Sequence, residues 1–125
     1  MPHPREHSPP QRPLAASDAV ALAERMAMFA TASRLRILYA LLPGERSVEE
    51  LADAAGLPAN TVSQQLRMLR STRLVRVRRD GRRAIYALHD PHVADLLVAV
   101  RHHDEHAAHG WAEGVPTEQV EDLPR

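Results

Sequence analysis

Residues 47–88 read SVEELADAAGLPANTVSQQLRMLRSTRLVRVRRDGRRAIYAL, a stretch in which two helical patterns precede a hairpin pattern. Ser47 and Glu50 have the spacing of a capping box, which predicts that a short helix begins there. Gly56-Leu57-Pro58 breaks that helix, and Asn60 is placed to cap a second one. The second helix has an apolar stripe at helical spacing, made by Val62, Leu66 and Leu69.

The hydrophobic period changes from helical to alternating after the second helix. Val75 and Val77 alternate with arginines, Asp80-Gly81 is a strong two-residue hairpin turn, and residues 84–88 form the return strand. A short helix, a turn with glycine and a second helix make the helix-turn-helix pattern, and a hairpin directly after it is typical of the winged form. The expected fold is therefore mainly α with a β-hairpin wing, a winged helix-turn-helix.

Further helices are expected on both sides of this stretch. Ser17 or Asp18 can cap one helix, and Thr31 can cap the next. After the hairpin, Asp90-Pro91 is an N-cap followed by proline at the first helical position, and this last helix is expected to run to about His109.

Length and composition indicate one domain, expected over residues 17–109 of the 125. Five of the ten prolines lie in residues 1–16, which are expected to be a disordered arm, and residues 110–125 are expected to be a flexible acidic tail. The absence of cysteine excludes disulfides, thiolate metal sites and a cysteine nucleophile. No apolar run approaches the roughly 20 residues of a membrane span, and the start lacks the apolar segment of a secretory signal, so a cytoplasmic location is expected.

Charge balances overall but is uneven along the chain. Sixteen basic residues, all of them arginine, match sixteen acidic ones. Between Thr61 and Arg83 eight arginines face the single acid Asp80, a local charge of +7, whereas residues 90–125 have a local charge of −6. A basic third centred on the second helix and the hairpin indicates a face that binds double-stranded DNA.

The second helix presents side chains that suit base edges. Gln and Asn can pair with adenine and Arg with guanine, while Ser and Thr suit bases or phosphates. Arginines around the hairpin tip are placed for phosphates or a minor groove, where contacts position the protein without reading sequence. For Asn60 alone, a purely capping role fits equally well. The candidate DNA-binding residues are Asn60, Thr61, Ser63, Gln64, Arg67, Arg78, Arg79, Arg82 and Arg83.

Six of the eight histidines lie between residues 89 and 109. At about 100° per residue, His103 and His106 can hold one metal ion together, but His92 lies about 16 Å before His103 on the same helix. Two such helices packed antiparallel across a two-fold axis bring Asp90 and His92 of one chain to the later pair of the other, which predicts a homodimer with shared metal sites. The structural alternative is that Asp90 is only an N-cap and that the later histidines only favour the helix dipole.

One carboxylate and three imidazoles suit Zn(II), Co(II) or Ni(II). Four ligands complete the coordination of Zn(II), whereas a six-coordinate ion uses further nitrogen and oxygen donors. The presence of such donors favours Ni(II), with Co(II) close to it and Zn(II) next. Because imidazoles bind metal in their neutral form, affinity is expected to fall as the pH drops through about 6.5. The further candidate ligands are Glu105, His3, His102 and His109.

The chain from Met28 to His109 resembles the ArsR/SmtB family of winged-helix metal sensors. The resemblance rests on the segments ASRLRIL at 32–38, VSQQLRML at 62–69, RDGR at 79–82 and IYALHDPHV at 85–93. It implies a homodimeric transcriptional regulator, in most members a repressor that metal releases from DNA. The metal roles it implies fall on Asp90, His92, His103 and His106. The DNA roles it implies fall on Asn60, Ser63 and Gln64.

Two departures from the family pattern are informative. Members that sense thiophilic ions carry Cys-x-Cys where this chain has Ser47-Val48-Glu49, so the resemblance implies no such site here. Many relatives have His where this chain has Gln64, a change that retains hydrogen-bonding capacity and alters base preference.

Three other functions are alternatives to DNA-binding metal regulation. An enzyme acting on a small organic substrate is disfavoured, because no Ser/His/Asp set, phosphate-binding loop or zincin motif occurs. A histidine-rich metal storage or buffering protein without sequence-specific DNA binding gives no reason for Gln64 and the arginine-rich hairpin. A winged-helix regulator whose histidines only pack the dimer is the third alternative.

Overall fold

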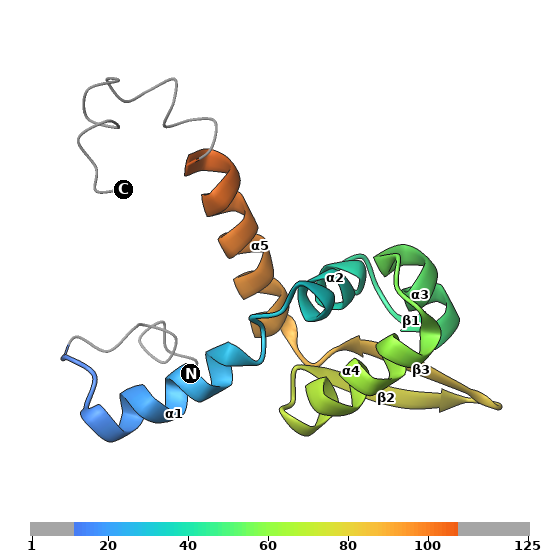
Figure 1. The fold of residues 1–125 in the computed structure, drawn as a ribbon, viewed down its shortest axis with the longest axis horizontal. Coiled ribbons are helices and arrows are strands. Elements are labelled where there is room, and N and C mark those ends of the chain that lie inside the picture. Colours follow the sequence, from blue (N-terminus) through green and yellow to red (C-terminus); the bar gives the residue numbers. More distant parts are fainter. Residues whose placement is uncertain (1–11, 108–125) are drawn as a thin grey trace, which may run out of the picture.

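The computed structural model describes residues 12–107. His3, His109, most of the predicted arm and the whole predicted tail lie outside the described residues. Within them the elements follow in the order α1 (Ala16–Ala27), α2 (Ala32–Ala40), β1 (Arg46–Ser47), α3 (Val48–Ala55), α4 (Ala59–Ser71), β2 (Val75–Asp80), β3 (Arg83–Leu88) and α5 (Pro91–Glu105) (Figure 1). This order is the predicted winged helix-turn-helix, with α3 and α4 as the two helices and β2–β3 as the wing.

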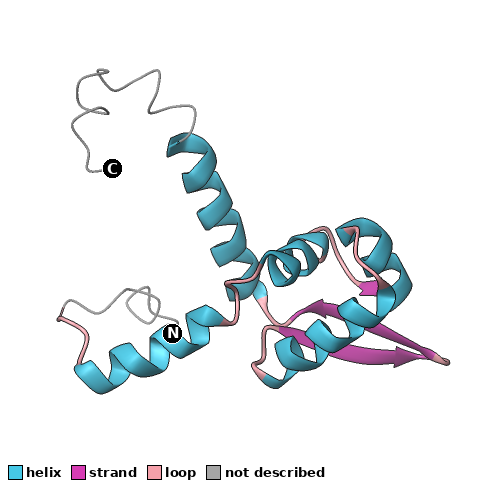
Figure 2. Cartoon of the chain, in the orientation of Figure 1, coloured by secondary structure: helices cyan, strands magenta, loops and turns pink. Residues whose placement is uncertain are grey.

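Helices α2, α3 and α4 pack with a small antiparallel sheet whose strand order is β1-β3-β2 (Figure 2). The predicted apolar stripe of α4, Val62, Leu66 and Leu69, is fully buried, as are Ile37 and Leu38 of α2. Burying one such side chain contributes roughly 1.5–3 kcal/mol. This core fixes the position of α4 and of the hairpin behind it.

Local hydrogen bonds begin three of the helices where the sequence predicts them. The Thr31 side chain accepts the backbone N–H of the third residue of α2 at 3.2 Å. Ser47 and Glu50 form the complete capping box, with distances of 2.8 and 3.2 Å. Asp90 Oδ1 accepts a backbone N–H of the first turn of α5 at 3.1 Å. These three caps confirm the predicted starts of α2, α3 and α5.

The predicted cap of α4 is wrong. The helix begins at Ala59 and its N-cap is Pro58, which is extended and makes no side-chain cap. Proline has no backbone N–H and a fixed φ, so it fits the last position before a helix. Asn60 therefore lies inside the first turn, where its Oδ1 accepts the N–H of Thr61 at 2.9 Å.

The start of α1 also differs from the prediction. The helix begins at Ala16, one residue before Ser17, and its N-cap Ala15 has no side-chain hydrogen bond. Asp18 lies in the first turn instead, where a carboxylate suits the positive end of the helix dipole. At the other end of the domain, α5 spans Pro91–Glu105 and residues 106–107 continue a helical turn, and the predicted helix end near His109 lies outside the described residues.

The hairpin turn is shifted by one residue from the prediction. Asp80 pairs with Arg83 across the strands, so the turn residues are Gly81 and Arg82. Gly81 has a φ of 64°, a left-handed conformation that glycine adopts without strain. The sequence analysis also missed β1, whose two residues are too few to show an alternating pattern.

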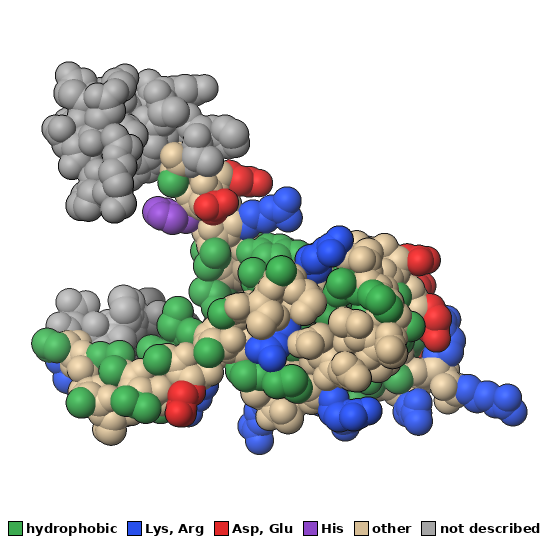
Figure 3. Space-filling view, in the orientation of Figure 1, with side chains coloured by type: hydrophobic (Ala, Val, Ile, Leu, Met, Phe, Trp, Pro, Cys, Tyr) green, Lys and Arg blue, Asp and Glu red, His purple; other side chains and the backbone are tan. Residues whose placement is uncertain are grey.

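Helices α1 and α5 extend away from the winged-helix body (Figure 1). No residue of α1 is buried, and apolar side chains gather along both helices in the space-filling view (Figure 3). Among the described residues, no helix is both long and apolar enough to span a membrane. The large apolar side chains exposed on or beside these helices are Leu14, Val20, Leu22, Met26, Leu96, Val98 and Val100.

Candidate DNA-binding face and metal ligands

The exposed side of α4 carries the predicted reading residues in one row. Asn60, Ser63, Gln64 and Arg67 follow one another at the i, i+3, i+4 and i+7 spacing of a single helix face, and all four are exposed. Thr61 is half-buried beside them. The buried stripe lies on the other side of the same helix, so packing against the core turns this polar row toward solvent.

The hairpin adds arginines to the same surface, and basic side chains gather along α4 and at the wing in the space-filling view (Figure 3). Arg78 forms a two-pronged ion pair with Glu45, with its Nη2 2.9 Å from Oε1, and Arg83 lies 3.7 Å from Glu50. The hydrogen bond from Arg78 lowers the pKa of Glu45, and the same bond raises the pKa of the Arg78 guanidinium. These two arginines are thus partly neutralised before any DNA arrives.

Arg79 and Arg82 are exposed and form no ion pair within residues 12–107. Of the four predicted wing arginines, these are the two whose charge no ion pair within the described residues offsets. Arg82 lies at the hairpin turn itself, where the wing projects farthest from the body (Figure 1).

An Arg82→Ala variant is expected to bind every DNA sequence more weakly by a similar factor. Its plot of log affinity against log salt concentration should flatten by about 0.9 for one lost phosphate contact. Fluorescence anisotropy with a selected and a scrambled duplex at several salt concentrations measures both quantities. Arg12→Ala, which removes the same charge from an exposed residue before α1, is the control, and an equal effect of that change contradicts a specific wing contact.

The first predicted pair of metal ligands lies at the start of α5. Asp90 Oδ1 is 3.6 Å from His92 Nδ1, and Asp90 Oδ2 accepts a hydrogen bond from His89 Nδ1 at 3.0 Å. The bond from His89, together with the backbone N–H of Val93, lowers the pKa of Asp90. The carboxylate is therefore ready in its ionised form, while also serving as the N-cap of α5.

The second predicted pair lies near the end of α5. His103 and His106 are exposed and one helical turn apart, with His106 at the C-cap. His102 is also exposed, whereas Glu105 lies 3.5 Å from Arg101 and is engaged there. Helix α5 has 15 residues and is therefore about 22 Å long, so the two pairs stay far apart.

Within residues 12–107 of one chain, no three His, Asp or Glu side chains come together as a metal site. The structure brings Asp90 to His92, and helical spacing keeps His103 beside His106, but one chain does not join the two pairs. The donor chemistry of a carboxylate and three imidazoles fits a divalent metal ion such as Zn(II), Co(II) or Ni(II). A complete site of this kind therefore needs a second chain.

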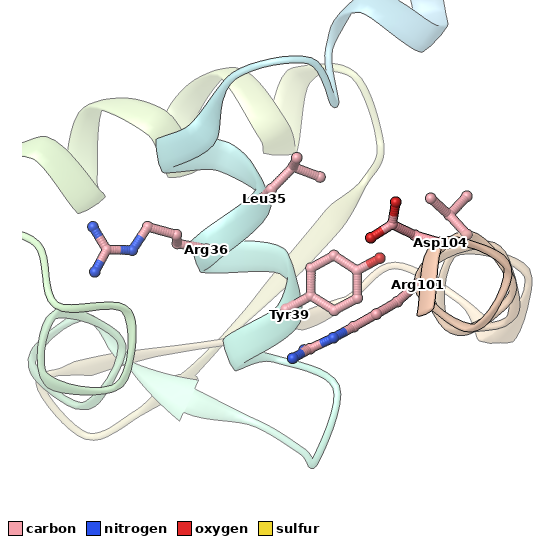
Figure 4. A pocket seen from close by; sticks show the side chains of 6 residues that line it. Leu35, Arg36, Tyr39, Arg101 and Asp104 are labelled. Atoms are coloured by element: carbon pink, nitrogen blue, oxygen red, sulfur yellow. The ribbon is translucent and has the colours of Figure 1, made fainter. Parts of the chain in front are cut away.

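The sequence analysis missed the contacts that fix α5 to α2. Tyr39 donates its hydroxyl hydrogen to the backbone carbonyl of Leu97 at 2.6 Å, and the Arg101 guanidinium lies 5.5 Å from the centre of the Tyr39 ring. Figure 4 shows Leu35 and Tyr39 of α2 facing Arg101 and Asp104 of α5 across an open hollow of about 400 Å³. No local pattern could have revealed them, because Tyr39 and Leu97 are 58 residues apart.

Comparisons with known proteins agree with this geometry. The family model described as "Bacterial regulatory protein, arsR family" matches residues 31–77. The HTH-type transcriptional regulator KmtR of Mycobacterium tuberculosis is 42% identical over 98 residues, which cover 78% of this chain and 75% of that protein. The regulator NmtR of the same organism is 41% identical over 108 residues, covering 86% and 90%.

Solved structures give the same result. The solution structure of apo-NmtR has a TM-score of 0.67 at 42% identity and covers 80% of this chain and 84% of its own. A domain of Mb0332 from Mycobacterium bovis, described as a homodimeric winged helix-turn-helix DNA-binding domain, has a TM-score of 0.66 at 34% identity, covering 75% and 91%. The family contains regulators of transcription rather than enzymes. The chain belongs to the ArsR family of bacterial regulatory proteins, and is a transcriptional regulator that binds DNA through its winged helix-turn-helix.

Proposed function

We propose that the chain is a homodimeric regulator whose DNA binding responds to a divalent metal ion, Ni(II) in preference to Co(II) or Zn(II). The observation that carries the proposal is the position of two pairs of candidate ligands at opposite ends of α5. Asp90 and His92 lie at its start, and His103 and His106 at its end. An antiparallel partner helix joins the first pair of each chain to the second pair of the other and completes two identical sites.

The exposed apolar side of α5 supports this pairing. At about 100° per residue, His92, Leu96, Val100 and His103 fall within about 80° of one another and so share one face of the helix. Leu96 is 44% exposed and Val100 is 55% exposed in the single chain. The same face therefore offers both the apolar contact and two of the proposed ligands. The homodimeric state described for the Mb0332 domain is consistent with it.

The proposed preference for Ni(II), and after it Co(II), over Zn(II) follows from the number of further donors near the site. His102 and Glu105 flank the second pair, and His3 and His109 are further candidates outside the described residues. Ni(II) titrated into the protein is expected to give the weak d–d absorption bands of an octahedral centre, because six-coordinate ions use donors that Zn(II) leaves aside. A four-coordinate Ni(II) spectrum contradicts the use of these extra ligands.

On the DNA side, we assign base reading to the polar row of α4 and phosphate binding to the wing. The relationship to KmtR and NmtR, both named transcriptional regulators, supports sequence-specific binding over metal storage alone. With two reading helices related by a two-fold axis, the operator is expected to be a pseudo-palindrome with half-sites about one helical turn apart.

A Gln64→Ala variant is expected to lose discrimination between the operator and scrambled DNA. A side chain that pairs with a base edge contributes about 1–3 kcal/mol of discrimination at each half-site. Its affinity for scrambled DNA should stay unchanged, since the side chain is neutral and its loss leaves the phosphate contacts intact. Competition anisotropy with the two duplexes measures both affinities, and equal losses on both contradict a base-reading role for Gln64.

A further inference from the structure

We propose that Arg34 is a positioning residue for DNA reading, which holds α4 in the orientation that the base contacts require. Its Nε donates to Gln65 Oε1 at 2.8 Å, and its Nη2 lies 3.6 Å from Met68 Sδ. Gln65 and Met68 are one turn apart on α4, so a single guanidinium from α2 contacts this helix at two points. The proposal rests on the assignment of base reading to α4 above.

Both ends of this contact are fixed before DNA binds. The backbone N–H of Arg34 is held by the Thr31 cap at 3.2 Å, and the two residues that follow its turn, Ile37 and Leu38, are fully buried in the core. Arg34 and Gln65 are themselves half-buried. A hydrogen bond from a charged donor in such a setting is stronger than one in open water. The guanidinium is therefore held against α4 by its two contacts.

The location of Gln65 explains how its hydrogen bond with Arg34 affects DNA recognition. Gln65 is directly between Gln64, in the polar row, and Leu66, in the fully buried stripe. The buried stripe sets the position of α4 against the core through apolar contacts, whose attraction is not directional. The hydrogen bond from Arg34 to Gln65 adds a directional contact at the flank of the helix, which restricts small rotations of α4 about its axis. The angle at which Gln64 meets a base edge then depends on a residue that reads no base.

Three roles for Arg34 give different results on DNA. If Arg34 contacts a phosphate, its loss weakens binding to all DNA sequences, and the slope of log affinity against log salt concentration flattens by about 0.9. If Arg34 is purely structural, its loss lowers the melting temperature without changing the ratio of operator affinity to scrambled-DNA affinity. If Arg34 is a positioning residue, its loss lowers the affinity for the operator selectively. The loss of its uncharged partner Gln65 then has the same selective effect.

The experiment compares Arg34→Met, Gln65→Leu and the double variant with the full-length wild type. The DNA probes are a duplex selected by the wild-type protein from a randomised pool and a scrambled duplex of the same composition, each tested at several salt concentrations. Circular dichroism melts check that every variant folds, and Gln65→Ala replaces Gln65→Leu if leucine does not fit. We expect Gln65→Leu to lower operator affinity about tenfold, with scrambled affinity and salt dependence unchanged.

Arg34→Met should give the same loss of the operator-to-scrambled ratio, and the double variant should lose no more than either single variant, because both remove one shared contact. Additive losses in the double variant, or an unchanged ratio in Gln65→Leu, overturn the proposal. A salt dependence that flattens in Arg34→Met while Gln65→Leu binds normally assigns Arg34 to a phosphate and also overturns it. A wild-type protein that selects no preferred duplex is a different failure, that of base reading by α4.

Discussion

A Leu96→Asp variant is expected to sediment as a monomer at micromolar concentration and to bind the operator at least about 100-fold more weakly than the wild type. Leu96 lies on the α5 face proposed to meet the partner helix, so each dimer would bury two carboxylates without partners. Losing the dimer also removes the second half-site contact, and linked contacts of this kind raise affinity by roughly 10²–10⁴. Analytical ultracentrifugation and anisotropy measure the two effects.

Val98→Asp is the matched control for this change. Val98 is on the same helix and is 55% exposed, but it points about 200° away from Leu96 and lines a hollow with Tyr39 and Leu42. The same new charge there should leave the dimer and its operator affinity nearly intact. A dimeric Leu96→Asp protein, or equal dissociation in both variants, contradicts the antiparallel packing of α5.

A His103→Ala variant is expected to bind Ni(II) more than about 100-fold more weakly. Losing a residue that only orients a metal ligand costs 10–100-fold in affinity, and losing a ligand itself should cost more. Competition with a chromophoric chelator measures the affinity, while sedimentation shows whether the dimer survives. The variant should remain dimeric, because the apolar contact at Leu96 and Val100 is unchanged.

His102→Ala provides the comparison on the neighbouring residue. Its imidazole lies about 100° around the helix from that of His103, so it can be at most an additional donor. Its loss should cost less than about tenfold in Ni(II) affinity. Unchanged affinity in His103→Ala, or equal losses in the two variants, contradicts the proposed ligand pair.

Signals confined to a few neighbouring residues predicted much of the fold. Thr31, Ser47 with Glu50, and Asp90-Pro91 each begin a helix where the sequence placed it, because a cap depends on contacts within one turn. The error at Asn60 has the same local origin. Two residues suited to the helix start lie close together, and Pro58, whose ring already fixes its backbone, takes the N-cap position.

Contacts between residues distant in sequence could not be predicted in this way. Arg34 with Gln65 and Arg78 with Glu45 join residues 31 and 33 positions apart, and they depend on how the helices and the wing pack. The sequence showed a row of candidate DNA contacts, but not that Arg78 is already paired. The proposed metal ligands are an intermediate case. Helical spacing predicts that His103 lies beside His106, whereas the contact of Asp90 with His92 depends on the start of α5, and the two pairs are too far apart on one helix to meet.

Operator binding with and without Ni(II) tests the central proposal most directly. Fluorescence anisotropy of the wild-type protein on its selected duplex, first metal-free and then with one Ni(II) per proposed site, gives the two affinities. They are expected to differ by about 5- to 150-fold, in either direction, and His103→Ala should abolish the difference. If Ni(II) binds tightly at these sites and the two operator affinities are the same, the chain is not a metal-responsive regulator.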